Sequence, residues 1–177
     1  MLKIVLLIGA VALGVLALVL VVGWLLPKQH VAARALALHR KPEEVFQLIS
    51  DFKAAPTWRS DVQQIEMLEA VNGHVRYREK STNGTITFEV MESNPPSRMV
   101  TRIADEGLPF GGRWIFEITP AGEGCRLNIT ERGEIYNPVF RFVSRFLLGY
   151  ERTLDAYLQN VSRKFGEKAV PTAGATL

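Results

Sequence analysis

The hydrophobic residues divide the chain into one unbroken apolar run and a longer stretch of mixed pattern. Residues 4–26 contain no charged or strongly polar side chain. As a helix rising about 1.5 Å per residue, this run spans roughly 34 Å, which is enough to cross the hydrocarbon core of a bilayer. A signal peptide usually has a shorter apolar region and a small-residue cleavage site, whereas this run ends in Trp24, two leucines and Pro27. We therefore predict an N-terminal transmembrane anchor over residues 1–27.

After Pro27 the pattern changes to short alternating segments. Residues 30–38 fit an opening strand. A helix is expected from Pro42, because a missing N–H is harmless in the first turn and the helix dipole favours the two glutamates that follow. The helical spacing of its apolar residues predicts one buried face: Val45, Phe46, Leu48, Ile49 and Phe52. Residues 54–56 interrupt this helix, so a short helical turn or a loop is expected up to residue 62.

Residues 62–135 alternate between apolar and polar positions and carry turn sequences at intervals. Asn72-Gly73 and Asn83-Gly84 are typical of two-residue hairpin turns. The positions between the apolar ones are largely polar, as in an antiparallel sheet with one face in water. We expect five or six strands in addition to the first.

The last predicted element is a long amphipathic helix. Asn137 can cap it and Pro138 can occupy its first turn, and an apolar stripe then continues to Phe165. Such a helix needs an apolar partner, which is the inward face of the sheet. Gly166 offers a stop signal, so residues 28–168 are predicted as one domain and residues 169–177 as a flexible tail.

The charge of the chain favours some binding partners over others. The net charge of +3 is small, with 21 basic and 18 acidic residues. This balance favours weak attraction to anionic lipid headgroups over a nucleic-acid footprint, so nucleic-acid binding is set aside. Only Lys3 precedes the anchor, and the basic residues that follow it favour a cytoplasmic domain: Lys28, Arg34, Arg40 and Lys41. A periplasmic or external domain is the alternative.

Residues 42–58, PEEVFQLISDFKAAPTW, contain a proline start, an aromatic residue after valine, an Asp-Phe exit and a Pro-x-Trp turn. With the order of the elements, this segment resembles the START-like (SRPBCC) superfamily, often labelled polyketide cyclase/dehydrase and lipid transport. The resemblance covers roughly residues 29–168 and leaves the anchor outside. It implies an α+β helix-grip fold, in which a curved antiparallel sheet wraps around a long C-terminal helix.

The resemblance also implies a cavity that holds an apolar or amphipathic ligand. Burying apolar surface contributes around 25 cal/mol per Å², so a lipid-sized molecule can bind without a reactive protein group. The candidate lining residues are Tyr77, Phe88, Val90, Ile103, Trp114, Phe116, Leu127 and Ile129 from the sheet, and Phe146, Tyr150 and Leu154 from the terminal helix. Simple core packing, which uses the same residue types, is the alternative for each of them.

Glu79 and Glu131 are the candidate catalytic residues. Strand parity places each glutamate on the same face as apolar neighbours, although solvent-facing edge positions are the alternative. Burial would raise the pKa of either carboxyl group and permit proton transfer, as cyclase or dehydratase chemistry needs. The hypothesis is that the two glutamates form one such site.

Other chemistry receives less support. His30, His39 and His74 have no metal-ligand spacing and are expected at the surface, so no metal or cofactor is predicted. The single cysteine, Cys125, cannot form a disulfide within the chain and has no evident partner for nucleophilic chemistry. Residues 107–112 lack the lysine of a phosphate-binding loop and fit a hairpin loop or a cavity gate. Four arginines are expected on a solvated helix face, with some near lipid headgroups: Arg141, Arg145, Arg152 and Arg163.

Three functions follow from these patterns. The expected one is noncatalytic binding or transfer of a hydrophobic, lipid-like small molecule by a membrane-tethered domain. A polyketide cyclase or dehydratase that uses buried carboxylates is one alternative, and an interaction module with a filled core is another. The volume and the wall chemistry of any enclosed cavity distinguish them.

Overall fold

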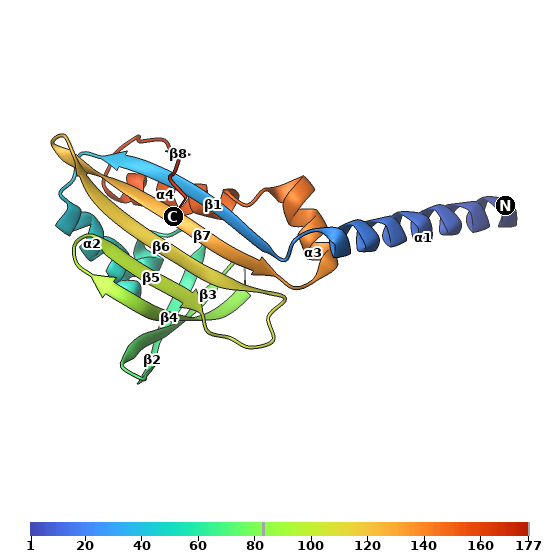
Figure 1. The fold of residues 1–177 in the computed structure, drawn as a ribbon, viewed down its shortest axis with the longest axis horizontal. Coiled ribbons are helices and arrows are strands. Elements are labelled where there is room, and N and C mark those ends of the chain that lie inside the picture. Colours follow the sequence, from blue (N-terminus) through green and yellow to red (C-terminus); the bar gives the residue numbers. More distant parts are fainter. Residues whose placement is uncertain (83, 177) are drawn as a thin grey trace.

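The computed structural model describes residues 1–82 and 84–176, and it begins with a helix that projects away from the rest of the chain (Figure 1). This helix, α1 (Leu2–Leu25), exposes nearly all of its side chains. Among the described residues, it is the one helix long and apolar enough to cross a membrane. The predicted apolar helix is therefore confirmed, and its insertion into a bilayer stays a prediction.

Within the described residues, an eight-stranded antiparallel sheet has the order β2-β3-β4-β5-β6-β7-β1-β8. The strands are β1 (Gln29–Leu38), β2 (Val62–Val71), β3 (His74–Ser81), β4 (Gly84–Asn94), β5 (Arg98–Ile103), β6 (Phe110–Ala121), β7 (Gly124–Ile135) and β8 (Thr172–Ala173). The opening strand and the six strands after it are those expected from the alternating pattern. Asn72 and Gly73 both adopt positive φ, as the predicted hairpin turn requires. Asn83, in the second predicted turn, lies outside the described residues.

The first two helices of the domain lie where the sequence predicts a helix and then an interruption. They are α2 (Pro42–Ser50) and the 3₁₀ helix η1 (Phe52–Thr57). The backbone N–H of Lys41 donates to Glu44 at 2.9 Å, and the Asp51 side chain accepts a hydrogen bond from the N–H of Ala54. These contacts satisfy amide groups that the first turn of a helix leaves unpaired.

The terminal helix is interrupted, which the apolar stripe did not predict. It consists of α3 (Pro138–Val143), a π-helical turn η2 (Ser144–Leu148) and α4 (Arg152–Lys164). The predicted cap is present, because the Asn137 side chain accepts hydrogen bonds from the first amides of α3. The break follows from Gly149, whose φ of 74° lies in a region that a right-handed helix cannot use. The α3–η2 segment (residues 138–148) therefore leaves the line of α4 and meets α1.

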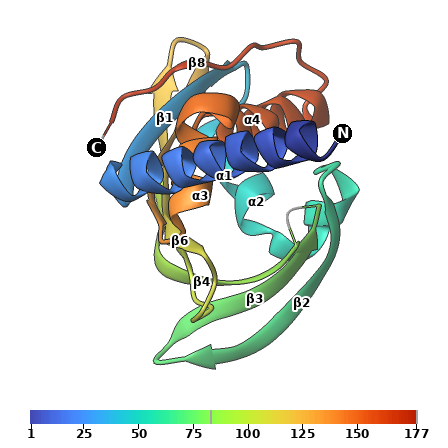
Figure 2. The same ribbon diagram turned by 90° about the vertical axis from the view of Figure 1, so that its right-hand side faces the viewer.

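The sheet curves from β1 round to β2, with α4 and α2 on its concave side (Figure 2). The helix-grip fold is thus confirmed. The tightest packing lies where α4 crosses β1 and β7, and the residues there are fully buried: Leu36, Leu127, Ile129, Leu154, Leu158 and Val161.

Residues 172–175 lie along the sheet, and the flexibility predicted for residues 169–177 stays a prediction. Strand β8 pairs with β1 through Arg34 and Ala35. The Asn128 side chain donates to the carbonyl oxygen of Ala175 at 3.1 Å and accepts from its N–H at 3.0 Å. Both backbone groups of Ala175 are satisfied by one side chain of β7, an arrangement that hydrophobic periodicity cannot reveal.

Candidate functional site

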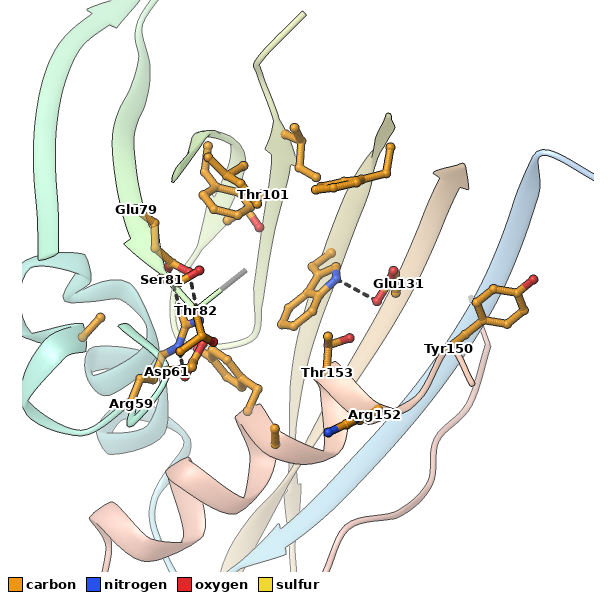
Figure 3. A pocket seen from close by; sticks show the side chains of 18 of the residues that line it. Arg59, Asp61, Glu79, Ser81, Thr82, Thr101, Glu131, Tyr150, Arg152 and Thr153 are labelled. Carbon is orange, nitrogen blue, oxygen red and sulfur yellow. Dashed lines mark hydrogen bonds and ion pairs between the residues drawn. The ribbon is translucent and has the colours of Figure 1, made fainter. Parts of the chain in front are cut away.

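The concave side of the sheet is hollow toward β3, β4 and β5. A cavity of about 830 Å³ lies between the sheet, η1, α4 and the α3–η2 segment, and apolar side chains make up most of its wall (Figure 3). This volume is in the range of pockets that hold drug-sized ligands. A cavity of this kind excludes the predicted alternative of a completely filled interior.

Six of the eleven predicted ligand residues line this cavity: Tyr77, Phe88, Ile103, Trp114, Phe116 and Tyr150. The other five lie elsewhere. Leu127, Ile129 and Leu154 are fully buried in the packed core, and Val90 lines a separate, smaller pocket. Phe146 is 56% exposed on the outside of η2. For the six lining residues, ligand contact stays a prediction.

Glu79 lines one end of the cavity, in a cluster of charged residues that we call the inner cluster (Arg59, Asp61 and Glu79). The Arg59 guanidinium donates to both Glu79 carboxylate oxygens, at 2.7 and 3.0 Å, and to Asp61 at 2.6 Å. It also lies over the Tyr157 ring of α4, with its central carbon 5.3 Å from the ring centroid. One arginine therefore connects the segment before β2 to β3 and to α4.

Burial governs protonation in the inner cluster. It raises the pKa of the Glu79 carboxyl group, and the attraction of Arg59 offsets this effect only in part. For Arg59, burial alone would lower the pKa, but Glu79 and Asp61 raise it above its usual value, so the guanidinium stays charged. Burial likewise raises the pKa of Tyr77 and of Tyr157, and both phenols stay neutral.

Glu131 lines a different part of the cavity, in what we call the outer cluster (His30, Trp114, Glu131 and Tyr150). The Trp114 indole N–H donates to Glu131 Oε2 at 3.1 Å, and His30 Nε2 lies 3.2 Å from Oε1. The His30 and Tyr150 rings are stacked, with centroids 4.0 Å apart. Figure 3 shows Glu131 on the same side of the cavity as Tyr150 and well away from Glu79.

The two glutamates therefore belong to separate clusters at different parts of one cavity, and a catalytic role for either stays a prediction. Their strands, β3 and β7, are four positions apart in the sheet order, roughly 19 Å along the sheet. Strand parity correctly placed both side chains on the inward face, since both line the cavity.

The sequence of this domain also matches a known family. Residues 30–166 match the sequence model described as polyketide cyclase / dehydrase and lipid transport. The chain belongs to this family. A search of curated proteins finds no match.

Solved structures agree with the family's fold. A conserved protein from Geobacillus kaustophilus is 17% identical, with a TM-score of 0.64 over 80% of this chain and 99% of the other. A START superfamily protein from Mycobacterium smegmatis is 18% identical, with a TM-score of 0.57 over 76% and 99%. The Zhui aromatase/cyclase from Streptomyces sp. R1128 is 11% identical, with a TM-score of 0.61 over 77% and 93%. The family and its fold support either hydrophobic-ligand binding or a cyclase role.

Two residues that line the cavity, His30 and Arg59, were misplaced or missed in the sequence analysis. His30 was expected at the surface, but its side chain is only 10% exposed. A signal was present, because His30 shares strand parity with the buried residues Ala32, Leu36 and Leu38. Arg59 had no comparable signal, because it lies between η1 and β2, where no periodic pattern applies.

Of the remaining polar candidates, the exposed Arg152 of α4 borders the cavity, and the others do not. Cys125 is buried in the core, which raises the pKa of its thiol to about 11. Arg141, expected on a solvated face, is buried and donates to the carbonyl oxygens of Trp24 and Leu26 at the end of α1. No group of three metal-ligating side chains occurs among the described residues. Phe110 and Gly111, from the predicted gating loop, do line the cavity.

Proposed function

We propose that the domain binds and transfers a hydrophobic or amphipathic small molecule in its cavity while α1 tethers it to a membrane. The observation that carries this proposal is the cavity itself, with its volume of about 830 Å³ and its apolar wall. An amphipathic ligand fits best, because the inner and outer clusters place polar side chains at two parts of a largely apolar wall.

A noncatalytic role is supported by how the charged groups of the cavity are engaged. Both oxygens of Glu79 accept hydrogen bonds from Arg59, and both oxygens of Glu131 are in contact with Trp114 or His30. A general base must direct a lone pair at its substrate, and these contacts direct each carboxylate at a protein group, although every oxygen keeps a second lone pair. These carboxylates instead orient neighbouring side chains and maintain the shape of the cavity.

We place the domain on the cytoplasmic face. Lys28 directly follows the apolar helix, and Arg40 and Lys41 come after the first strand, against Lys3 on the other side. Arg34 and Arg40 contribute less than the sequence suggested, because Arg34 pairs with Asp155 at 2.6 Å and Arg40 with Glu167 at 3.6 Å inside the folded domain.

The binding experiment uses native mass spectrometry of the full-length protein extracted in detergent. Bound hydrophobic molecules should be observed directly or after addition of lipids and polyketide-like aromatic compounds. Ile103→Trp adds an indole to the cavity wall and should abolish this binding, whereas Val75→Trp makes a similar addition at an exposed position of β3 and should not. Wild-type protein that stays empty with every compound would refute the proposal.

A cyclase or dehydratase is the second candidate, and one observation favours it. Burial raises the pKa of Glu79 within an apolar cavity, which is how a carboxyl group becomes able to donate a proton near neutral pH. Glu79→Gln and Glu131→Gln separate the two functions. Loss of turnover of a polyketide-like substrate in either variant, with binding retained, would establish catalysis, whereas an absence of turnover in the wild type with binding intact favours simple carriage.

A further inference from the structure

The α3–η2 segment presents apolar side chains to the outside of the molecule. Leu147 is 71% exposed, Phe146 56%, Leu148 51% and Phe140 47%. Soluble surfaces rarely gather large apolar residues in this way over a few turns of helix. Arg145 lies among them and is exposed, as basic residues are in helices that lie at a membrane surface.

The same segment is fastened to the end of the apolar helix α1. The Arg141 guanidinium donates to the carbonyl oxygens of Leu26 at 2.8 Å and Trp24 at 3.3 Å, and so satisfies carbonyl groups that the end of α1 leaves unpaired. Gly23 packs so closely on α3 that any added side chain would collide with the Pro138 carbonyl oxygen. The exposed apolar surface therefore lies next to the place where α1 would leave a bilayer.

The inner side of this segment faces the cavity. Val143 and Ser144 line it, together with Gly149 at the break in the helix, and the exposed side chains of Phe140 and Leu148 border it as well. One thin element thus separates the cavity from the surface nearest the membrane. Its π-helical turn and the positive φ of Gly149 mark the point where its backbone departs from regular helix.

We propose that the α3–η2 segment lies in the interfacial layer of the membrane that holds α1, and forms the doorway through which the ligand passes between lipid and cavity. The occupant of the exposed apolar surface is the bilayer itself, because the surface is continuous with the membrane-proximal end of α1. The doorway rests on the proposed ligand binding, whereas the membrane contact rests only on the insertion of α1 into the bilayer.

The membrane contact is tested by fluorescence in vesicles of phosphatidylcholine and phosphatidylglycerol that contain the full-length protein. Leu147→Cys and Val71→Cys are labelled with the polarity-sensitive dye NBD, and Val71 serves as an exposed apolar control at the β2–β3 hairpin. Cys125 can stay, because it is buried and the pKa of its thiol is about 11, and unlabelled wild type reports any residual reaction.

We expect nitroxide-labelled lipids to quench the dye at position 147 at least about twofold more than the dye at position 71. Equal quenching would overturn the proposal. A blue-shifted but unquenched dye at position 147 would overturn it too, since the surface would then be covered by protein, such as a second copy of the chain.

The doorway is tested by transfer kinetics with cis-parinaric acid, a fluorescent fatty acid, delivered from vesicles. Leu147→Asp should slow its transfer roughly tenfold, because a carboxylate is costly to place in the interface, and the matched variant Val71→Asp should not. Affinity in detergent should be equal for both, since neither residue lines the cavity.

Unchanged transfer by Leu147→Asp would overturn the doorway, and Leu147→Gln repeats the test if the charged variant does not reconstitute. No binding of any compound by the wild type in detergent would instead refute the proposed function, and would leave the quenching result to decide the membrane contact by itself.

Discussion

The two halves of the sheet are stabilised differently. Where α4 crosses β1 and β7, apolar side chains fill the space completely, as with Leu127, Ile129 and Leu158, which have no exposed surface. Toward β3, β4 and β5, aromatic and aliphatic side chains face an open cavity, and the ion pairs of Arg59 connect the elements around it. The filled half depends on close packing, whereas in the hollow half charged groups connect the elements of the cavity wall.

This difference shows how a small domain can contain a large cavity and still fold. Close packing in one half supplies stability, so the other half can leave apolar surface uncovered. The buried charges of the hollow half are costly unless they are paired, and pairing keeps them in one geometry. Variants that remove one kind of contact at a time can test this division.

Removing Arg59 should have the largest effect. Arg59→Met keeps most of the side-chain volume but leaves Glu79 buried without its partner, which costs about 3–5 kcal/mol of unfolding free energy. Chemical unfolding of the full-length protein in detergent, followed by circular dichroism, measures the loss. The double variant Arg59→Met with Glu79→Met should recover much of it, and a double variant as unstable as the single one would show that the cluster does not act as a pair.

A matched pair of isoleucines compares packing in the two halves. Ile129→Ala, in the filled half, should cost about 3 kcal/mol, because the lost side chain leaves a void in close-packed surroundings. Ile103→Ala, in the cavity wall, should cost only about 1 kcal/mol, because it enlarges a space that already exists. The same unfolding measurement checks both, and equal losses would mean that the cavity is closed in solution.

The pH dependence of stability should depend on Glu79. Because burial raises the pKa of this carboxyl group in the folded protein, the native state binds its proton more tightly than the unfolded chain. The unfolding free energy should therefore fall as the pH rises from about 4.5, the ordinary value, through the raised pKa of the folded state. Glu79→Gln should lack this part of the decline. Curves of unfolding free energy against pH that are parallel for variant and wild type would contradict the assignment.

The strands and most helices of both halves were predicted from the sequence, but the position of the cavity was not. Alternation along β3 and β7 correctly placed Tyr77 and Glu131 on the inward face, because side chains in a strand have a strict period of two. The position of a residue in a strand determines the face of the sheet on which its side chain lies. It does not determine whether another side chain packs against it or a cavity adjoins it. Ile129 and Phe116 therefore looked alike in the sequence, although Ile129 is fully buried in the packed core and Phe116 borders the cavity.

The features missed by the sequence depend on contacts between distant segments. Arg59 and Glu79 meet only because the chain returns after a hairpin, and Arg141 reaches α1 from 115 residues away, as its bond to Leu26 shows. The break at Gly149 was hidden because the apolar stripe continues through it. Phe146 followed the stripe as predicted, but the break turns it outward.

The smallest expected effect concerns a side-chain hydrogen bond in the cavity wall, between Trp114 of β6 and Glu131 of β7. Trp114→Phe keeps an aromatic ring and removes the N–H that donates to Glu131 at 3.1 Å. The loss should be about 1 kcal/mol or less, because Glu131 retains its contact with His30 and its side chain is 19% exposed, so water from the cavity can replace the lost donor. Unfolding in detergent tests this against Ile129→Ala. A loss as large as that of the isoleucine variant would mean that water does not reach Glu131, and that the outer cluster belongs to the filled half of the domain.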